Sequence, residues 1–282
     1  MRPIKRIHPA DYRPIADLIT YSPMPSYQLQ QVDPFIFLNH HGHQTYKPNN
    51  QGLPFGPHPH RGMETVTFIL EGDIMHQDSG GHQSVIEAGG IQWMTAGSGL
   101  IHAEVSSDKF KREGGDLEIL QLWVNLPAKL KMTKPRYIGK QKSEMNHIQV
   151  NEKVSAQVIA GGWDDVAGSF ETLFPISLHT VTMQSGGSFE KMIPAEENIF
   201  FYVVRGKVKV SGEEVPFRNL VEFKNEGDAL AVEALEDSII LLGHAKPHNE
   251  PMVAQGPFVM NTREEIMQAY QDYQDGKFGS WD

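Results

Sequence analysis

Two short histidine-containing motifs carry the clearest chemistry in the sequence. His58 and His60 are separated by one residue, and His102 and Glu104 repeat that spacing further along the chain. Residues two apart on a strand point to the same side, so each pair could present both side chains to one ion. Two such pairs on facing strands would supply three imidazoles and one carboxylate. That set suits a divalent transition metal with positions left open for a substrate or dioxygen.

Each pair alone has a simpler explanation, because a lone His-x-His is often ordinary surface polarity or part of a turn held by proline. Pro57 and Pro59 flank the first histidine, so the turn is a real alternative there. Both pairs occur together beside glycine-rich stretches, and this coincidence favours the metal site. Glu64 offers a second carboxylate near the first pair. The spacing therefore leaves the acidic ligand open between Glu64 and Glu104.

Other polar residues near these motifs are less specific. Arg61 follows a predicted ligand and could steady an anionic substrate, while Gln121 interrupts an apolar strand and could point inward. We favour a structural hydrogen bond for both. The histidine-rich segment 39–43 is interpreted as a solvated turn, and the segment 75–79, which contains a histidine and an aspartate, as turn structure.

Composition limits the class of protein. The chain has 282 residues, which at about 150 residues per domain suggests two domains. Its 25 basic and 35 acidic residues give a net charge of −10, so direct nucleic-acid binding through a basic surface is not expected. Cysteine is absent, so disulfides are excluded and a metal must be held by His, Asp, Glu or backbone oxygen.

The histidines are unevenly distributed. Of 13, nine lie in the first 102 residues, which suggests that one half of the molecule has chemistry that the other lacks. The first residues form no signal-peptide pattern, and the apolar runs are too short to span a bilayer. We expect a soluble, cytoplasmic protein without a membrane segment.

Short β-prone segments punctuated by glycine follow one another along both halves of the chain. In the first half they cover 64–70, 84–87, 92–95 and 117–126; in the second they cover 177–183, 200–204, 208–210, 229–232 and 239–242. This pattern is typical of an antiparallel sandwich or barrel. Residues 68–72 (FILEG) are echoed by 202–206 (YVVRG), which indicates two tandem copies of one β fold.

These features predict an N-terminal domain over 1–135 with the metal site and a C-terminal domain over 136–282 without one. The basic segment 129–142 is interpreted as a solvated connector, with a docking patch for an anion or partner as the alternative. A capping box formed by Thr262 and Glu265 begins a helix near 262–275, and Gly276 ends it.

The sequence resembles the pirin family of the cupin superfamily. Gly52, followed by His58-x-His60 and Glu64, resembles the first cupin motif, and residues 90–102 resemble the second more loosely. The stretches that look like pirin are 58–65 (HPHRGMET), 92–99 (QWMTAGSG), 102–104 (HAE), 121–127 (QLWVNLP) and 256–262 (GPFVMNT). Together these matches extend from about residue 30 to the C-terminus.

The resemblance implies an all-β fold of two tandem cupin jelly rolls, or double-stranded β-helices, with a short C-terminal helix. It implies one divalent metal per chain, Fe(II), bound in the first domain by His58, His60, His102 and Glu104. Glu64 would then be an acceptor that orients a histidine. Aligning Gly72 with Gly206 places Met192, Pro194 and Asn198 opposite His58, His60 and Glu64, so a like site is not expected in the second half.

The resemblance also implies an activity. Several pirins are dioxygenases that open the heterocyclic ring of flavonols such as quercetin with loss of carbon monoxide, and Glu104 could take up the hydroxyl proton. A small aromatic substrate and dioxygen would be the partners. The alternative is an iron-dependent redox sensor that binds a transcription factor or metabolic enzyme, with segment 129–142 as its docking site. A third possibility is a scaffold that the metal merely stabilises.

Overall fold

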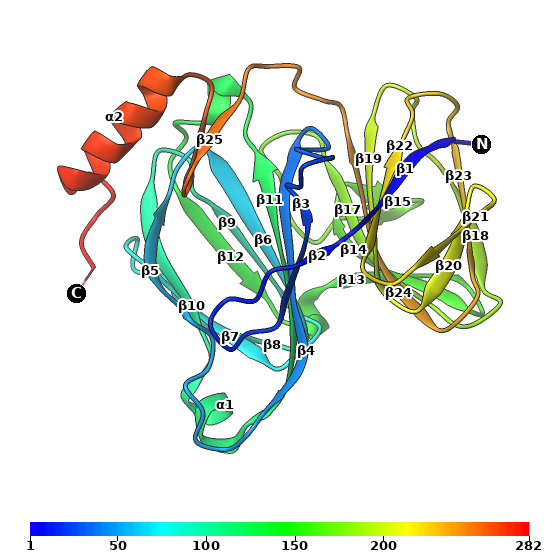
Figure 1. Cartoon of the computed structure of the whole chain (residues 1–282), viewed down its shortest axis with the longest axis horizontal. Helices are drawn as coiled ribbons and strands as arrows, with labels where there is room; N and C mark the ends of the chain where they lie inside the picture. The colour runs from blue at the N-terminus through cyan, green and yellow to red at the C-terminus, as the bar shows by residue number, and fades with distance from the viewer. Residues whose placement is uncertain (282) are drawn as a thin grey trace. The chain divides into compact units, whose positions relative to one another are not determined.

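The computed structural model of the protein describes residues 1–281, which form mainly antiparallel strands and two short α-helices (Figure 1). The chain divides into two compact units. Unit 1 comprises Met1–Asp11, Pro23–Pro34 and Glu144–Pro247; unit 2 comprises Tyr12–Ser22, Phe35–Ser143 and the chain from His248 onward. Each unit therefore includes one terminal segment from the opposite half of the sequence. The chain passes from unit 2 to unit 1 after Ser143, a few residues beyond the predicted boundary at 135.

Unit 2 has the two sheets of a jelly roll. The larger has the order β12 (Arg136–Lys140), β9 (Ile91–Thr95), β6 (Met63–Glu71), β11 (Gly115–Asn125), β4 (Phe35–Tyr46), β3 (Thr20–Met24) and β2 (Asp11–Tyr12). The smaller has the order β5 (Phe55–His60), β10 (Leu100–Val105), β7 (Asp73–Asp78) and β8 (Gln83–Glu87). Alternate residues of β6 supply the core, because Met63 packs with Met94 and Val259 while Ile69 packs with Ile119.

Unit 1 repeats this arrangement. Its larger sheet has the order β1 (Ile4–Pro9), β22 (Asn219–Phe223), β19 (Asn198–Arg205), β24 (Ser238–Ala245), β17 (Ser177–Met183), β14 (Val154–Ala160) and β13 (Asn146–Asn151). Its smaller sheet has the order β18 (Ser188–Met192), β23 (Ala229–Ala234), β20 (Lys207–Val210) and β21 (Glu213–Pro216). A core of valine, isoleucine, leucine and phenylalanine side chains from both sheets fills the unit.

The echoed segments 68–72 and 202–206 occupy corresponding places. The first ends β6 and turns into β7, and the second ends β19 and turns into β20; in each unit the chain thereby passes from the middle of the larger sheet to the smaller one. Both turn glycines, Gly72 and Gly206, have positive φ, of 83° and 78°. The predicted tandem pair of cupin jelly rolls is confirmed.

The remaining elements are short. They are the hairpins β15–β16 (Gly162–Trp163, Val166–Ala167) and β25–β26 (Val253–Gln255, Phe258–Met260), the 3-10 turns Ala128–Leu130 and Lys142–Glu144, and the helices α1 (Asp108–Glu113) and α2 (Arg263–Gln274). The predicted capping box is present, since Thr262 Oγ1 accepts from Glu265 N and the Glu265 carboxylate accepts from Thr262 N. Within residues 1–281, neither α-helix combines the length and apolar character needed to cross a bilayer.

Three sequence interpretations are wrong. Segment 75–79 is not turn structure, because residues 75–78 belong to β7. Segment 39–43 is not a solvated turn but part of β4, where His40 and His41 are buried. The segment 129–142 is not a solvated connector throughout, because β12 pairs with β9 and the Lys131 side chain is buried. A buried ammonium group cannot contact a partner protein, so Lys131 cannot belong to a docking patch on segment 129–142.

Candidate metal centre

The two histidine motifs lie on neighbouring strands of the smaller sheet of unit 2. Strands β5 and β10 pair antiparallel, with His58 opposite His102 and His60 opposite Leu100. Figure 1 shows these strands beside β7, which pairs with the other edge of β10. The i, i+2 spacing in each motif therefore turns the side chains to the same face of one sheet.

One ligand atom from each of His58, His60 and His102 lies within 4.8 Å of the other two. The Nδ1 atom of His58 lies 2.7 Å from the carbonyl oxygen of Gly56, and Nδ1 of His60 lies 3.1 Å from that of Pro257. A carbonyl only accepts, so each Nδ1 is the protonated nitrogen and each Nε2 carries the free lone pair. This is the tautomer that a second acceptor typically imposes on a metal-binding histidine.

Burial lowers the pKa of His60 and of His102 and so keeps these two imidazoles neutral. Desolvation, with a smaller contribution from His58, lowers the pKa of His60 to about 3. Desolvation followed by the neighbouring histidines holds the pKa of His102 well below its ordinary value. Nε2 of His60 and both ring nitrogens of His102 are buried without a hydrogen-bond partner. The free nitrogens of His60 and His102, together with His58 beside them, fit a transition metal, which binds the deprotonated ring nitrogen.

Glu104 is buried two residues after His102 on β10. One carboxylate oxygen accepts from Thr67 Oγ1 at 2.8 Å, and the other accepts from the side-chain amide of Gln121. The amide oxygen of Gln121 in turn accepts from Trp123 Nε1 at 3.1 Å. Glu104 is not a member of the group whose ligand atoms lie within 4.8 Å. Its hydrogen bonds fix the carboxylate beside that group, and Gln121 faces the inside of the barrel.

Glu64 lies elsewhere in the fold. It is fully buried on β6, and its carboxylate accepts from Thr95 Oγ1 at 2.6 Å. The register of β6 with both neighbours is regular from Glu64 to Thr67, so these residues point to opposite faces of the sheet. Because Thr67 bonds to Glu104, Glu64 faces away from Glu104. The structure therefore does not bring Glu64 to the histidines.

The Arg61 side chain makes contacts that stabilise the fold. Its guanidinium donates to the carbonyl oxygen of Ser98 and to Asp272 on α2, both at 2.8 Å, and lies 4.6 Å from the centre of the Phe278 ring. Only 4% of the residue is exposed. These contacts attach the end of β5 to the C-terminal segment and leave little of the guanidinium for a substrate.

The segment 256–262 holds the turn that follows β5. Besides the contact of Pro257 with His60, Val259 N donates to Arg61 O at 3.0 Å. A Cβ at Gly62 would come within 2.0 Å of Val259 O, so only glycine permits this approach. A motif near the end of the sequence thus positions His60, a predicted ligand, which lies almost 200 residues earlier.

His76 is a neighbour of the site that the sequence interpretation missed. It lies in β7 rather than a turn, opposite Glu104 in the strand register, and its ring centre is 5.5 Å from that of His102. Its Nε2 is 2.9 Å from an Asp78 carboxylate oxygen, and its ring stacks on Tyr137 at 3.8 Å. The repeated His-x-acid spacing at 76 and 78 was the available signal.

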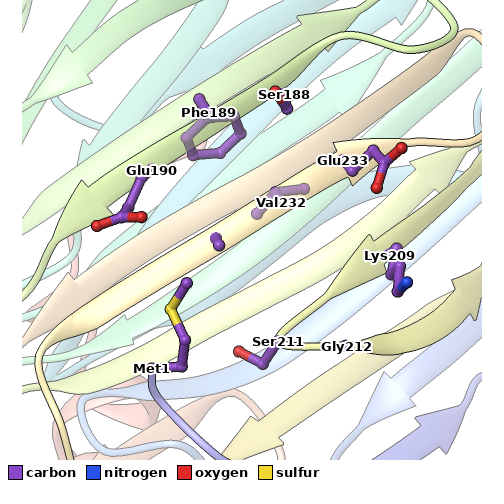
Figure 2. Close-up of a pocket in the computed structure, with 10 residues that line it drawn as sticks. Met1, Ser188, Phe189, Glu190, Lys209, Ser211, Gly212, Val232 and Glu233 are labelled. Atoms are coloured by element: carbon purple, nitrogen blue, oxygen red, sulfur yellow. The ribbon is translucent and has the colours of Figure 1, made fainter.

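Partly exposed aromatic rings surround the histidines. Trp123 stacks on Phe37 with ring centres 4.5 Å apart and makes an edge contact with His60 at 5.1 Å. A surface hollow in unit 1 is lined by residues that include Glu190, Lys209 and Glu233 and by none of these histidines (Figure 2). The aromatic wall beside the histidines is therefore the better match to a flat, apolar ligand.

Two jelly rolls, one of which holds a group of three convergent histidines, define a bicupin. The Pirin family model matches residues 18–124, and the model of the Pirin C-terminal cupin domain matches residues 178–279. The chain belongs to the pirin family.

Individual relatives agree with this assignment. A pirin-like protein of Caulobacter vibrioides is 38% identical over 260 residues, which cover 89% of each chain. The crystal structure of a quercetin 2,3-dioxygenase from Acinetobacter baumannii is 33% identical, with a TM-score of 0.93 over 99% of each chain. The Escherichia coli pirin YhhW, solved in complex with nickel(II), shares the fold at 23% identity and a TM-score of 0.70, covering 86% of this chain and 99% of that one.

Proposed function

We propose that this pirin-family protein is an iron-dependent dioxygenase that cleaves flavonols such as quercetin. The convergence of His58, His60 and His102, with unpartnered ring nitrogens on the latter two, carries the proposal. The similarity to a quercetin 2,3-dioxygenase over nearly the whole chain supplies the reaction class. Fe(II) is proposed as the metal, although the nickel(II) complex of a relative makes metal content a quantity to measure.

Glu104 is proposed as the fourth ligand and as the base. A bound ferrous ion would supply the redox chemistry with dioxygen and would acidify a bound hydroxyl. Thr67 and Gln121 donate to the two carboxylate oxygens of Glu104, which fixes its orientation. An oriented carboxylate can accept the flavonol hydroxyl proton.

The aromatic residues are proposed to orient the substrate. Trp123 is partly exposed between Phe37 and His60, and its indole N–H is held by Gln121. A planar flavonol could stack on this surface while its hydroxyl group approaches Glu104. The same rings would exclude water from the reacting face of the substrate.

The assay is to load the protein with Fe(II) without oxygen, quantify bound iron, add quercetin in air, and follow both the loss of its absorbance and the release of carbon monoxide. We expect about one iron per chain and turnover with carbon monoxide release. His58→Ala should lose most of both, because it removes one of three imidazole ligands. Turnover no faster than that of His58→Ala would refute the dioxygenase.

The carboxylate assignment is tested with a matched pair. We expect Glu104→Gln to reduce both bound iron and turnover at least tenfold, because a neutral amide is a poor ligand and a poor base. Glu64→Gln should retain iron, because Glu64 bonds to Thr95 and faces the other side of β6. Loss of iron in Glu64→Gln alone would reverse the assignment.

A further inference from the structure

Unit 1 has a polar cluster at one end of an otherwise apolar barrel. On β17, His179 lies two residues before the core residue Val181, and on β24, His244 lies two residues after the core residue Leu242. Residues two apart on a strand point to the same face, so both histidines face the core. Lys191 on β18 likewise follows the core residue Phe189 by two positions. Three basic side chains from three strands therefore replace apolar ones on the inner face of the barrel.

Contacts join these side chains into one group. The Lys191 ammonium lies 4.3 Å from the centre of the Trp163 ring, and the His179 ring lies 5.1 Å from the same indole. The ring centres of His179 and His244 are 6.4 Å apart. We call the set of Trp163, His179, Lys191 and His244 the basic cluster. Counting histidines along the sequence did not reveal it, because β17 and β24 become neighbours only in the folded sheet.

The cluster contains buried polar atoms that lack protein partners. His179 is fully buried, and neither of its ring nitrogens has a hydrogen bond. His244 Nδ1 lies 2.5 Å from a Glu197 carboxylate oxygen, whereas its Nε2 is buried and unpartnered. Burial of unsatisfied polar groups costs free energy. Neutral His179 has one N–H donor, and this buried, unpartnered N–H indicates a ligand that would accept from it.

We propose that the basic cluster binds a small organic anion that bears a single carboxylate group. The carboxylate would accept from the Lys191 ammonium and from the N–H of His179. Apolar side chains pack the barrel beneath the cluster, so the ligand must be small. Lys191 is partly exposed, and the side chains of His244 and Glu197 are 12% and 20% exposed, which gives the ligand an entry from solvent.

The charges select this class of ligand. Desolvation lowers the pKa of both His179 and His244, so Lys191 supplies the principal positive charge. That ammonium would repel a metal cation. Glu197 lies on the far side of His244 and would oppose a second negative charge, such as that of inorganic phosphate near neutral pH. A ligand with one carboxylate matches the one ammonium of the basic cluster.

Trp163 provides the readout because it touches both His179 and Lys191. We would titrate the full-length protein with sodium acetate and, separately, with inorganic phosphate, holding ionic strength constant with sodium chloride. The expected result is a saturable change in Trp163 fluorescence with acetate, absent from Trp163→Phe. The absence of a saturable acetate response would overturn the proposal, and tighter binding of phosphate would overturn the single-charge assignment.

A matched pair of lysine variants distinguishes binding at the basic cluster from a general effect of losing one positive charge. Lys191→Met should weaken acetate binding at least tenfold, whereas Lys209→Met, at the exposed hollow of Figure 2, should leave it unchanged. His179→Asn, which keeps a polar group, should also weaken binding, and circular dichroism would verify that each variant is folded. Equal affinities in Lys191→Met and Lys209→Met would overturn the site. Bound iron should not change in Lys191→Met or in Lys209→Met. A loss of acetate binding would therefore not reflect a loss of the proposed dioxygenase site.

Discussion

Histidine has three physical roles in this chain, and its surroundings decide among them. His60 has a free, buried ring nitrogen directed into a group of imidazoles. His40 instead bonds to Glu118 at 2.9 Å, and His41 bonds to Thr20 at 2.8 Å. His179 is buried, and its ring nitrogens have no hydrogen-bond partner. Burial alone therefore does not identify a ligand; the free nitrogens and the neighbouring side chains do.

The buried His41 should make stability depend on pH. Desolvation, with a smaller effect of His40, lowers the pKa of His41 from 6.5 to about 3. Below pH 6.5 the unfolded chain binds a proton that the folded protein does not, so the free energy of unfolding falls as pH decreases toward 3. For this one residue the loss between about pH 7 and about pH 5.5 is about 1.4 kcal/mol.

Urea unfolding of the metal-free protein at these two pH values would measure the effect. His41→Asn should lose about 1.4 kcal/mol less on acidification than the unmodified chain. The exposed His147 offers a control, since His147→Asn should keep the full pH dependence. Identical acid sensitivity in His41→Asn and the unmodified chain would contradict the prediction.

At the scale of elements, the sequence predicts the strands and helix ends that local patterns determine. The β-prone segment 177–183 is β17 with the same ends, and the helix begins at its capping box. The two His-x-His and His-x-Glu motifs predict three convergent histidines because their spacing matches a strand. Strand β4 is missed, because its histidines and glycine look polar until Glu118 and Thr20 are brought beside them by strand pairing.

Contacts between residues far apart in the sequence explain the remaining differences between the predictions and the structure. No local pattern pairs His60 with Pro257, or places Arg61 against Asp272, because these partners are about 200 residues apart. Lys131 is the sharpest example. Its ammonium donates to the oxygens of Gly62, Asn125 and Val259 at 2.6–2.9 Å, inside a segment that reads as solvated from its charge.

Lys131 should therefore stabilise the junction between the turn after β5 and strand β26. In Lys131→Met three buried acceptors lose their shared donor, and we expect unfolding to become easier by about 3 kcal/mol. Lys129→Met, at an exposed position of the same segment, should change stability by less than about 0.5 kcal/mol. Urea denaturation of both variants measures the difference. Equal stability would show that the segment behaves as the solvated connector that its composition suggests.

At the scale of the whole molecule, each compact unit depends on the opposite end of the chain. Strand β1 pairs with β22 in unit 1, where the fully buried Arg2 guanidinium donates to the carbonyl oxygens of Pro194 and Gly227. In unit 2, Pro257 and the C-terminal helix hold His60 and Arg61. The two barrels share a topology, yet one end carries a three-histidine group in unit 2 and a basic cluster in unit 1.

Shortening the chain at either end should therefore damage the unit built mainly from the other half. A chain lacking residues 1–11 loses β1 and the buried Arg2, so Trp163 emission should shift to longer wavelength as unit 1 loosens, while iron still binds at His58 and its neighbours. A chain ending at Gln255 loses Pro257 and α2, so it should lose iron while Trp163 emission stays unchanged. Subtracting the spectrum of the matching Trp163→Phe chain isolates the signal. If either deletion removed iron binding and shifted Trp163 emission together, the two terminal segments could not act on separate units.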